Sequence, residues 1–75
     1  TPIEPLEVGG GKVFAIHGRK MLFVLESFTE AMILPLVEMK PREIIAIDGV
    51  FNDTDMLKTN LDLQCRDAGI RFTCL

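Results

Sequence analysis

Several features that would assign this sequence to a familiar class are missing from it. The chain of 75 residues has no apolar run approaching the roughly 18 to 20 residues that a membrane-spanning helix needs. Its start has neither the basic end nor the apolar core of a signal peptide. It has two cysteines, Cys65 and Cys74, without Cys-x-x-Cys spacing, whereas a disulfide scaffold of this size normally carries four or more. We therefore expect no membrane partner, reduced thiols and a cytoplasmic location.

Concentrated positive charge is missing as well. The chain carries 8 Lys and Arg against 11 Asp and Glu, a formal net charge of −3, and its basic side chains are scattered. A nucleic-acid-binding module usually presents a basic surface that neutralises phosphates. We therefore expect no direct nucleic-acid contact from this chain.

Apolar residues, in contrast, are abundant for so short a chain. They make up 48% of the sequence, and the mean hydropathy is +0.29. A chain of this length forms one domain and buries only about 60% of the surface that its unfolded form exposes. Some apolar side chains must then remain on the surface, where they favour contact with a partner.

Few residues could take part in catalysis or ligand binding, and each of them also has a simpler structural interpretation. His17 is the only histidine and lies beside a predicted turn, with no Ser or Cys placed as a nucleophile. The string GGGK at 9–12 lacks the GxxxxGK[ST] pattern and the following helix of a phosphate loop. Asp48 and Asp53 follow a predicted parallel strand, where a divalent metal could bind, but turn and cap roles suit them better.

Residues 1–11 are predicted to be a linker, because they combine prolines with three consecutive glycines. A first residue that is Thr suggests a fragment excised from a longer protein. Residues 12–75 are then one small α/β domain. Its first two strands, 13–17 and 20–25, are joined through Gly18-Arg19, which favours a type II′ hairpin.

The next segment is predicted to be a kinked helix. The sequence from Ser27 to Glu30 matches a capping box, and the helix is expected to run to about Lys40. Pro35 removes one helical hydrogen bond at a cost of about 3 kcal/mol unless the helix bends there. A shorter helix with Pro35 in its first turn is the alternative, but it is too short to be stable alone. The apolar stretch of this helix is predicted to be an interface, made of Ala31, Met32, Ile33, Leu34, Leu36 and Val37.

The rest of the chain predicts a strand at 44–47, a helix at 55–68 that Gly69 ends, and a final strand at 70–75. The final strand alternates apolar and polar residues, which is typical of an edge, while the two strands before it are continuously apolar. With right-handed crossovers, these elements form a two-layer ββαβαβ fold of the α/β class. Its four-stranded mixed sheet has the order 1-2-3-4, strand 1 is antiparallel, and both helices cover one face. The other face is left open.

A short motif in the last third of the chain resembles that of a known family. The family pattern is an aromatic residue, two variable residues, Asn-Asp-Gln-x-Lys, a small residue and Asn, and here its matching positions are Phe51, Asp55, Lys58 and Asn60. Thr54 stands where the pattern has its first Asn, as the predicted helix cap, and Met56 replaces Gln. Over residues 12–75 the chain resembles the C-terminal domain of adenine-specific DNA methyltransferases of restriction-modification systems, especially the modification subunits of type III systems.

This resemblance implies a parent protein that methylates adenine in DNA with S-adenosylmethionine and usually works as a dimer. The chain itself lacks an Asp/Asn-Pro-Pro-Tyr-like motif and a Phe-x-Gly-x-Gly cofactor loop. We therefore expect no catalytic, cofactor-binding or metal-binding residue in it. The predicted function is that of a non-catalytic accessory domain that packs against the parent methyltransferase or a second copy. The alternative is a small metal- or phosphate-binding enzyme or regulatory domain that uses Asp48, Asp53 and Lys58.

Overall fold

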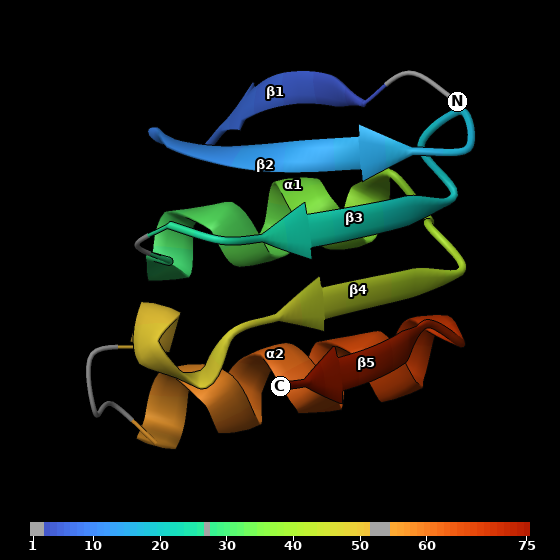
Figure 1. The fold of residues 1–75 in the computed structure, drawn as a ribbon. Helices are drawn as coiled ribbons and strands as arrows, with labels where there is room; N and C mark the ends of the chain where they lie inside the picture. Colours follow the sequence, from blue (N-terminus) through green and yellow to red (C-terminus); the bar gives the residue numbers. More distant parts are fainter. Residues whose placement is uncertain (1–2, 27, 52–54) are drawn as a thin grey trace.

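The computed structural model describes residues 3–26, 28–51 and 55–75, whose backbone forms one mixed sheet with two helices (Figure 1). The sheet has the strand order β1-β2-β3-β4-β5. Two 3-10 turns, η1 and η2, precede the helices. The elements in chain order are β1 (Glu4–Val8), β2 (Gly11–Ile16), β3 (Met21–Val24), η1 (Glu30–Met32), α1 (Ile33–Glu38), β4 (Glu43–Ala46), η2 (Asp48–Phe51), α2 (Asp55–Ala68) and β5 (Arg71–Cys74).

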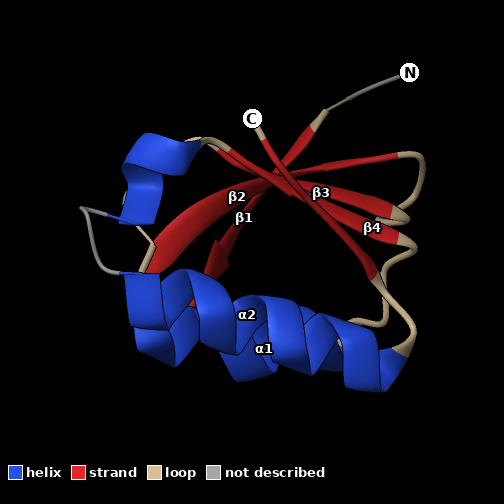
Figure 2. Cartoon of the chain, turned by 90° about the horizontal axis from the view of Figure 1, so that it is seen from below, coloured by secondary structure: helices blue, strands red, loops and turns tan. Residues whose placement is uncertain are grey.

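The predicted topology of four strands is confirmed by β2 to β5. Strand β2 pairs antiparallel with β3, and β3, β4 and β5 run parallel in that order. Figure 2 shows α1 and α2 on the same side of the sheet. Right-handed crossovers explain this arrangement, because both crossovers step in the same direction across the sheet. Strand β5 lies at an edge, as its alternating sequence predicted.

The predicted linker is wrong for residues 4–8, which form a fifth strand. Strand β1 pairs antiparallel with β2, and Gly9 and Gly10 connect the two strands with φ of 56° and 86°. Two consecutive residues with positive φ are typical of a type I′ hairpin turn, which glycine forms without strain. Leu6 and Val8 turn toward the core, and Val8 is buried there. Pro5 is compatible with the strand because β1 is an edge strand.

The turn between β2 and β3 also differs from the prediction. His17, Gly18 and Arg19 all have positive φ, 58°, 65° and 72°, and the positive φ of Arg19 excludes type II′. Arg19 Nε donates a hydrogen bond to Glu4 Oε1 over 3.1 Å, so this turn is linked to β1. The hydrogen bond from Arg19 and its positive charge lower the pKa of the Glu4 carboxyl.

The first helix is shorter than predicted, and the kink at Pro35 is wrong. Helix α1 begins at Ile33, so Pro35 lies in its first turn, where a missing N–H leaves no helical hydrogen bond unmade. The 3-10 turn η1 precedes it, and Lys40, with φ of 50°, follows it. The six-residue helix is stable because it is packed, with Met32 and Leu36 fully buried against the rest of the chain. The predicted cap at Ser27 lies outside the described residues.

The bounds of α2 are as predicted. Gly69 ends the helix with φ of 74°. The N–H of Ile70 donates to the carbonyl of Cys65 over 2.7 Å, and the N–H of Gly69 donates to the carbonyl of Arg66 over 3.2 Å. These two bonds form a Schellman motif, which satisfies carbonyls at the end of the helix and turns the chain into β5. Thr54, the predicted N-cap, lies outside the described residues.

The hydrophobic core lies between the sheet and the helices. The ring of Phe51 stands edge-to-face against Phe28 and Phe72, with centroids 5.6 Å and 6.3 Å apart. This cluster joins η2 to the edge strand β5. No polar or charged side chain of the described residues is buried. The core therefore consists of apolar side chains, mainly Val13, Leu22, Val24, Met32, Leu36, Ile44, Leu61 and Cys65.

Replacing Gly9 and Gly10 of the β1–β2 turn by alanine, one at a time, should distinguish the energetic cost of positive φ from the cost of steric overlap. Both substitutions place a side chain at positive φ, which costs about 1–2 kcal/mol. A Cβ on Gly9 would also overlap the backbone carbonyl of Ala31 in η1, whereas a Cβ on Gly10 meets open space. We expect Gly9→Ala to lower the free energy of unfolding by at least about 1 kcal/mol more than Gly10→Ala, measured by urea denaturation. Equal losses would contradict the packing of this turn against η1.

Candidate functional site

The side of the sheet opposite to the helices is an apolar surface, which we call the bare face. In each strand alternate residues turn to this side, while their neighbours turn toward the helices. In β3, for example, Leu22 and Val24 are buried under the helices, and Phe23 lies on the bare face. Following the strand register, and continuing the alternation one residue beyond the strands at Ile3, Leu25, Ile47 and Leu75, we assign fifteen residues to the bare face. They are Ile3, Pro5, Glu7, Lys12, Phe14, Ile16, Met21, Phe23, Leu25, Glu43, Ile45, Ile47, Arg71, Thr73 and Leu75.

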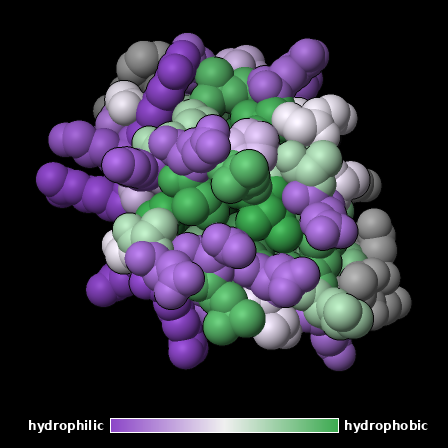
Figure 3. All heavy atoms as spheres, turned by 180° about the vertical axis from the view of Figure 1, so that it is seen from behind, coloured by the Kyte–Doolittle hydropathy of each residue, from purple (hydrophilic) through white to green (hydrophobic). Residues whose placement is uncertain are grey.

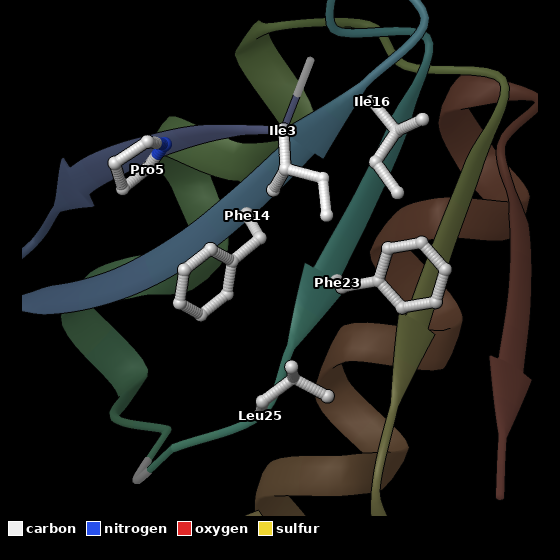
Figure 4. Close-up of a pocket in the computed structure, with 6 residues that line it drawn as sticks. All are labelled: Ile3, Pro5, Phe14, Ile16, Phe23 and Leu25. Carbon is white, nitrogen blue, oxygen red and sulfur yellow. The ribbon is translucent and has the colours of Figure 1, made fainter. Parts of the chain in front are cut away.

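The part of the bare face over β1, β2 and β3 is hollowed. Its hollow has a volume of about 640 Å³, and Figure 4 shows the lining side chains projecting from the same side of the sheet. Ile3 and Leu25 are 59% and 47% exposed at its ends. None of the described side chains that line it is charged, so these residues offer apolar contact and no acid–base chemistry. The lining residues are Ile3, Pro5, Phe14, Ile16, Phe23 and Leu25.

Charged residues occupy two opposite corners of the bare face. Glu7 of β1 is the register partner of Lys12 of β2 at one corner. Glu43 of β4 is the register partner of Arg71 of β5 at the other. Thr73 Oγ1 donates a hydrogen bond of 2.7 Å to Glu43 Oε2, which holds that carboxylate on the bare face. Each corner thus carries one acid and one base, and the surface between the corners is apolar.

The helix-covered side has a different surface. Figure 3 shows this side, where hydrophilic side chains surround hydrophobic ones near the middle of the view. The large apolar side chains exposed on the helices are Leu34, Met56 and Leu63, at 64%, 76% and 56%. Leu34 belongs to α1, whereas Met56 and Leu63 are seven residues apart on α2. Ile3, Leu25, Ile47 and Leu75 are the corresponding exposed side chains of the bare face among the described residues.

The predicted interface on the first helix needs correction. Met32, Ile33 and Leu36 are buried in the core, and Val37 packs partly against it. Their burial is internal because α1 packs against the sheet and lies beside α2 in the same layer. Of the predicted set, Ala31 and Leu34 remain exposed and available to a partner.

The residues of the family-like motif do not converge on one site. Phe51 is buried in the aromatic cluster of the core. Asp55, the exposed first residue of α2, and Lys58 line a hollow of about 580 Å³ beside Phe72 of β5. Asn60 is exposed on α2 and lines a different hollow, beside Leu34. Thr54 lies outside the described residues. The described residues of the motif are therefore spread over the core and two separate surfaces of α2.

The structure describes the residues of the metal-binding alternative only in part. Asp48 begins η2, Lys58 is half-buried on α2, and Asp53 lies outside the described residues. Within residues 3–26, 28–51 and 55–75, no three or more His, Cys, Asp and Glu side chains are grouped as a metal site would need. His17 is exposed at the β2–β3 turn, as predicted.

The two cysteines are not joined by a disulfide. Cys65 lies in the core on α2, and burial raises the pKa of its thiol to about 11, with a smaller contribution from the negative charge of Asp62. Such a thiol stays protonated and is a poor nucleophile. Cys74 is half-buried on β5.

Neither protein-family models nor curated proteins match this sequence. In the part of the chain that the structure describes, no helix has the length and apolar character needed to cross a membrane. The longest helix, α2, has 14 residues.

The reactivity of Cys65 should report the opening of the core. In a Cys74→Ser variant, Cys65 is the only thiol, and we expect a thiol reagent at pH 8 to modify it only as fast as the chain unfolds. In a Cys65→Ser variant, the half-buried Cys74 should react at least about 100-fold faster. The absorbance of the chromophore that the thiol reagent releases measures both modification rates. Rapid modification of Cys65 without denaturant would show that α2 does not hold this thiol in the core.

Proposed function

We propose that this chain is a non-catalytic interaction domain that binds a protein partner through the bare face. The observation that carries the proposal is the contrast between the two faces of one sheet. The helices bury Val24 and Ile44, whereas Phe23 and Ile45, the next residues along the same strands, have no helix over them. Large contiguous apolar patches are uncommon on monomers, and they often mark interaction sites. Burying such a patch stabilises a complex by roughly 25 cal/mol for each Å² of apolar surface.

The resemblance to adenine-specific DNA methyltransferases supplies the class of parent protein. In this proposal the chain is the C-terminal accessory domain of a restriction-modification methyltransferase in the cytoplasm. The parent would bind S-adenosylmethionine and DNA with residues outside this chain. The order of β2, β3, α1, β4, α2 and β5 supports the proposal, because it agrees with the layout that the resemblance implies.

The chemistry of the bare face also supports an accessory role. Its hollow is lined by carbon-rich side chains, which cannot transfer a proton or hold a phosphate. Its four charged residues are two acids and two bases, so the face has no excess of positive charge to attract DNA. Partner binding is then the function that fits these residues best.

A hydrophobic dye should test whether the bare face is an accessible binding surface. At protein concentrations below one micromolar, we expect a naphthalene sulfonate dye to fluoresce with the wild-type chain and to lose at least about half of that signal with Phe23→Lys. Leu63→Lys is the matched control, because Leu63 is exposed on α2 on the other side of the molecule. Equal signals from all three proteins, with unchanged circular dichroism, would contradict the proposal.

The DNA sequence upstream of the Thr1 codon is a separate test of the class of parent protein. The proposal expects the reading frame ahead of Thr1 to encode an adenine-methylation motif and a cofactor loop. DNA sequencing of this region gives the answer directly. An initiator codon immediately before Thr1 would contradict a methyltransferase parent and would leave the interaction surface to be explained by itself.

A further inference from the structure

The two edges of the sheet differ in what they offer to another strand. Figure 1 shows β1 and β5 as the outermost strands. An edge strand presents backbone N–H and C=O groups that no neighbouring strand uses, and a further strand can pair with them. Which residues present these groups follows from the strand pairing, because the backbone groups of successive residues point to opposite sides of a strand.

The β1 edge is protected against strand addition. Val8 and Gly11 flank a two-residue hairpin turn, so they bond to each other, and every second residue of β1 faces β2 in the same way. Pro5 and Glu7 therefore face outward. Pro5 has no N–H to donate, and an outward proline is a common protection of a sheet edge.

The β5 edge has no such protection. The N–H of Arg71 donates to the carbonyl of Arg42, next to β4, over 3.0 Å. The N–H of Leu75 donates in the same direction, to the carbonyl of Ala46 over 2.8 Å. The N–H and C=O of Phe72 therefore face away from β4, and no other described residue bonds to them. These groups are available to an extended segment.

A groove opens beside this edge on the helix side of the sheet. It is the hollow of about 580 Å³ between β5 and α2. Asp55, Thr59 and Asp62 have the spacing that places them on one flank of the helix. A strand added to β5 would project every second side chain toward this flank. The complete lining is Asp55, Lys58, Thr59, Asp62, Phe72 and Cys74.

The lining determines which side chains fit the groove. Phe72 is half-buried and offers an apolar surface. The charged lining residues are two acids, Asp55 and Asp62, and one base, Lys58, so negative charge is in excess. Asp62 Oδ2 lies 3.5 Å from Arg66 Nη2, but the Asp62 side chain is 38% exposed and can accept a second cation. The groove is therefore complementary to an apolar side chain and a basic one.

We propose that the β5 edge binds an extended segment of a partner protein, which pairs with Phe72 as a sixth strand of the sheet. The segment carries an apolar and a basic side chain two residues apart, because alternate side chains enter the groove together. Backbone hydrogen bonds contribute affinity in such strand addition, and the groove selects the sequence. The segment lies beside the sheet, so this inference concerns a different surface from the bare face and does not rest on the proposed function.

Fluorescence anisotropy of short labelled peptides tests the selectivity of the groove. The probe is fluorescein-labelled Thr-Ile-Thr-Lys-Thr-Val-Thr, whose Ile and Lys project to the same side of an extended strand. Replacing its Lys by Glu should weaken binding at least about tenfold. Exchanging Lys with the Thr that follows it puts the charge on the other side and should weaken binding at least about fivefold. Equal binding of the three peptides, or no saturable binding below about 1 mM, would overturn the inference.

Removal of one backbone N–H tests strand addition itself. Native chemical ligation at Cys65 allows a synthetic segment 65–75 to carry an N-methyl group on Phe72. This change removes the outward N–H and keeps every side chain and the hydrogen bonds to β4. The probe should bind the methylated chain at least about tenfold more weakly than the unmodified ligated chain. Urea denaturation compares the stability of the two proteins, and unchanged probe binding would exclude pairing at β5.

Charge reversal in the groove provides a second, independent variant. Asp62→Lys should reverse the preference, so that the Glu peptide binds more tightly than the Lys peptide. Asp67→Lys is the matched control, because Asp67 is exposed on α2 outside the groove, and it should keep the preference for the Lys peptide. A preference that both variants keep, or both reverse, would show that the groove does not select the basic side chain.

Phe23→Lys separates this inference from the proposed function. Phe23 lies on the bare face, away from the β5 edge, so this variant should bind the probe within about twofold of the wild-type chain while losing its dye signal. Loss of probe binding in Phe23→Lys, with the fold intact, would place the peptide on the bare face and overturn binding at β5. Probe binding that needs the Phe72 N–H, in a chain that binds no dye, would retain the β5 site and contradict the proposed function.

Discussion

One-sided cover of the sheet is the constraint on which the rest of this structure depends. From β3 the chain moves to β4 and then to β5, each time to the next position in the same direction. Right-handed crossovers then place both helices on the same face. A helix on the other face would require a crossover in the opposite direction, and none occurs among the described elements. The one-sided core and the bare face therefore both follow from the right-handed crossovers.

The short helix α1 shows how tertiary packing completes what the local sequence leaves marginal. A six-residue helix has little stability of its own. Met32 and Leu36 anchor it, and the Gly9 turn approaches η1 so closely that only a glycine fits there. The β1–β2 hairpin therefore supports the entry of the helix as well as widening the sheet. Apolar residues that looked like an interface are needed for this internal packing.

Much of the fold could be predicted because its signals are local. The run from Asp55 to Ala68 has helical periodicity and a glycine directly after it, so both bounds of α2 were predicted correctly. Strand order followed from the contrast between continuous and alternating apolar strands. The open face followed from the topology, although its residues on β1 were missed.

The wrong predictions concern residues whose usual conformational preference differs from what their position in the structure requires. Pro5 indicated a linker, yet proline is allowed in an edge strand, and the alternation of Leu6 and Val8 before two glycines was the signal for β1. Pro35 indicated a kink, yet it costs nothing in a first turn. Arg19 adopts positive φ, as His17 and Gly18 do, because the tight turn between β2 and β3 imposes it, which its side chain does not predict. The bare face could not be assembled from sequence without the register of all five strands.

These observations describe a small domain whose core lies on one side of its sheet and whose other side is apolar and has no helix over it. Solvent exposure of isoleucine methyl groups tests this account most directly, because the seven isoleucines divide between the two sides. In a dilute methyl-labelled sample, a soluble paramagnetic agent should broaden the methyl resonances of Ile3, Ile16, Ile45 and Ile47. Those of Ile33, Ile44 and Ile70, which are buried, should stay sharp. Equal protection of both groups would contradict a sheet that its helices cover on one face alone.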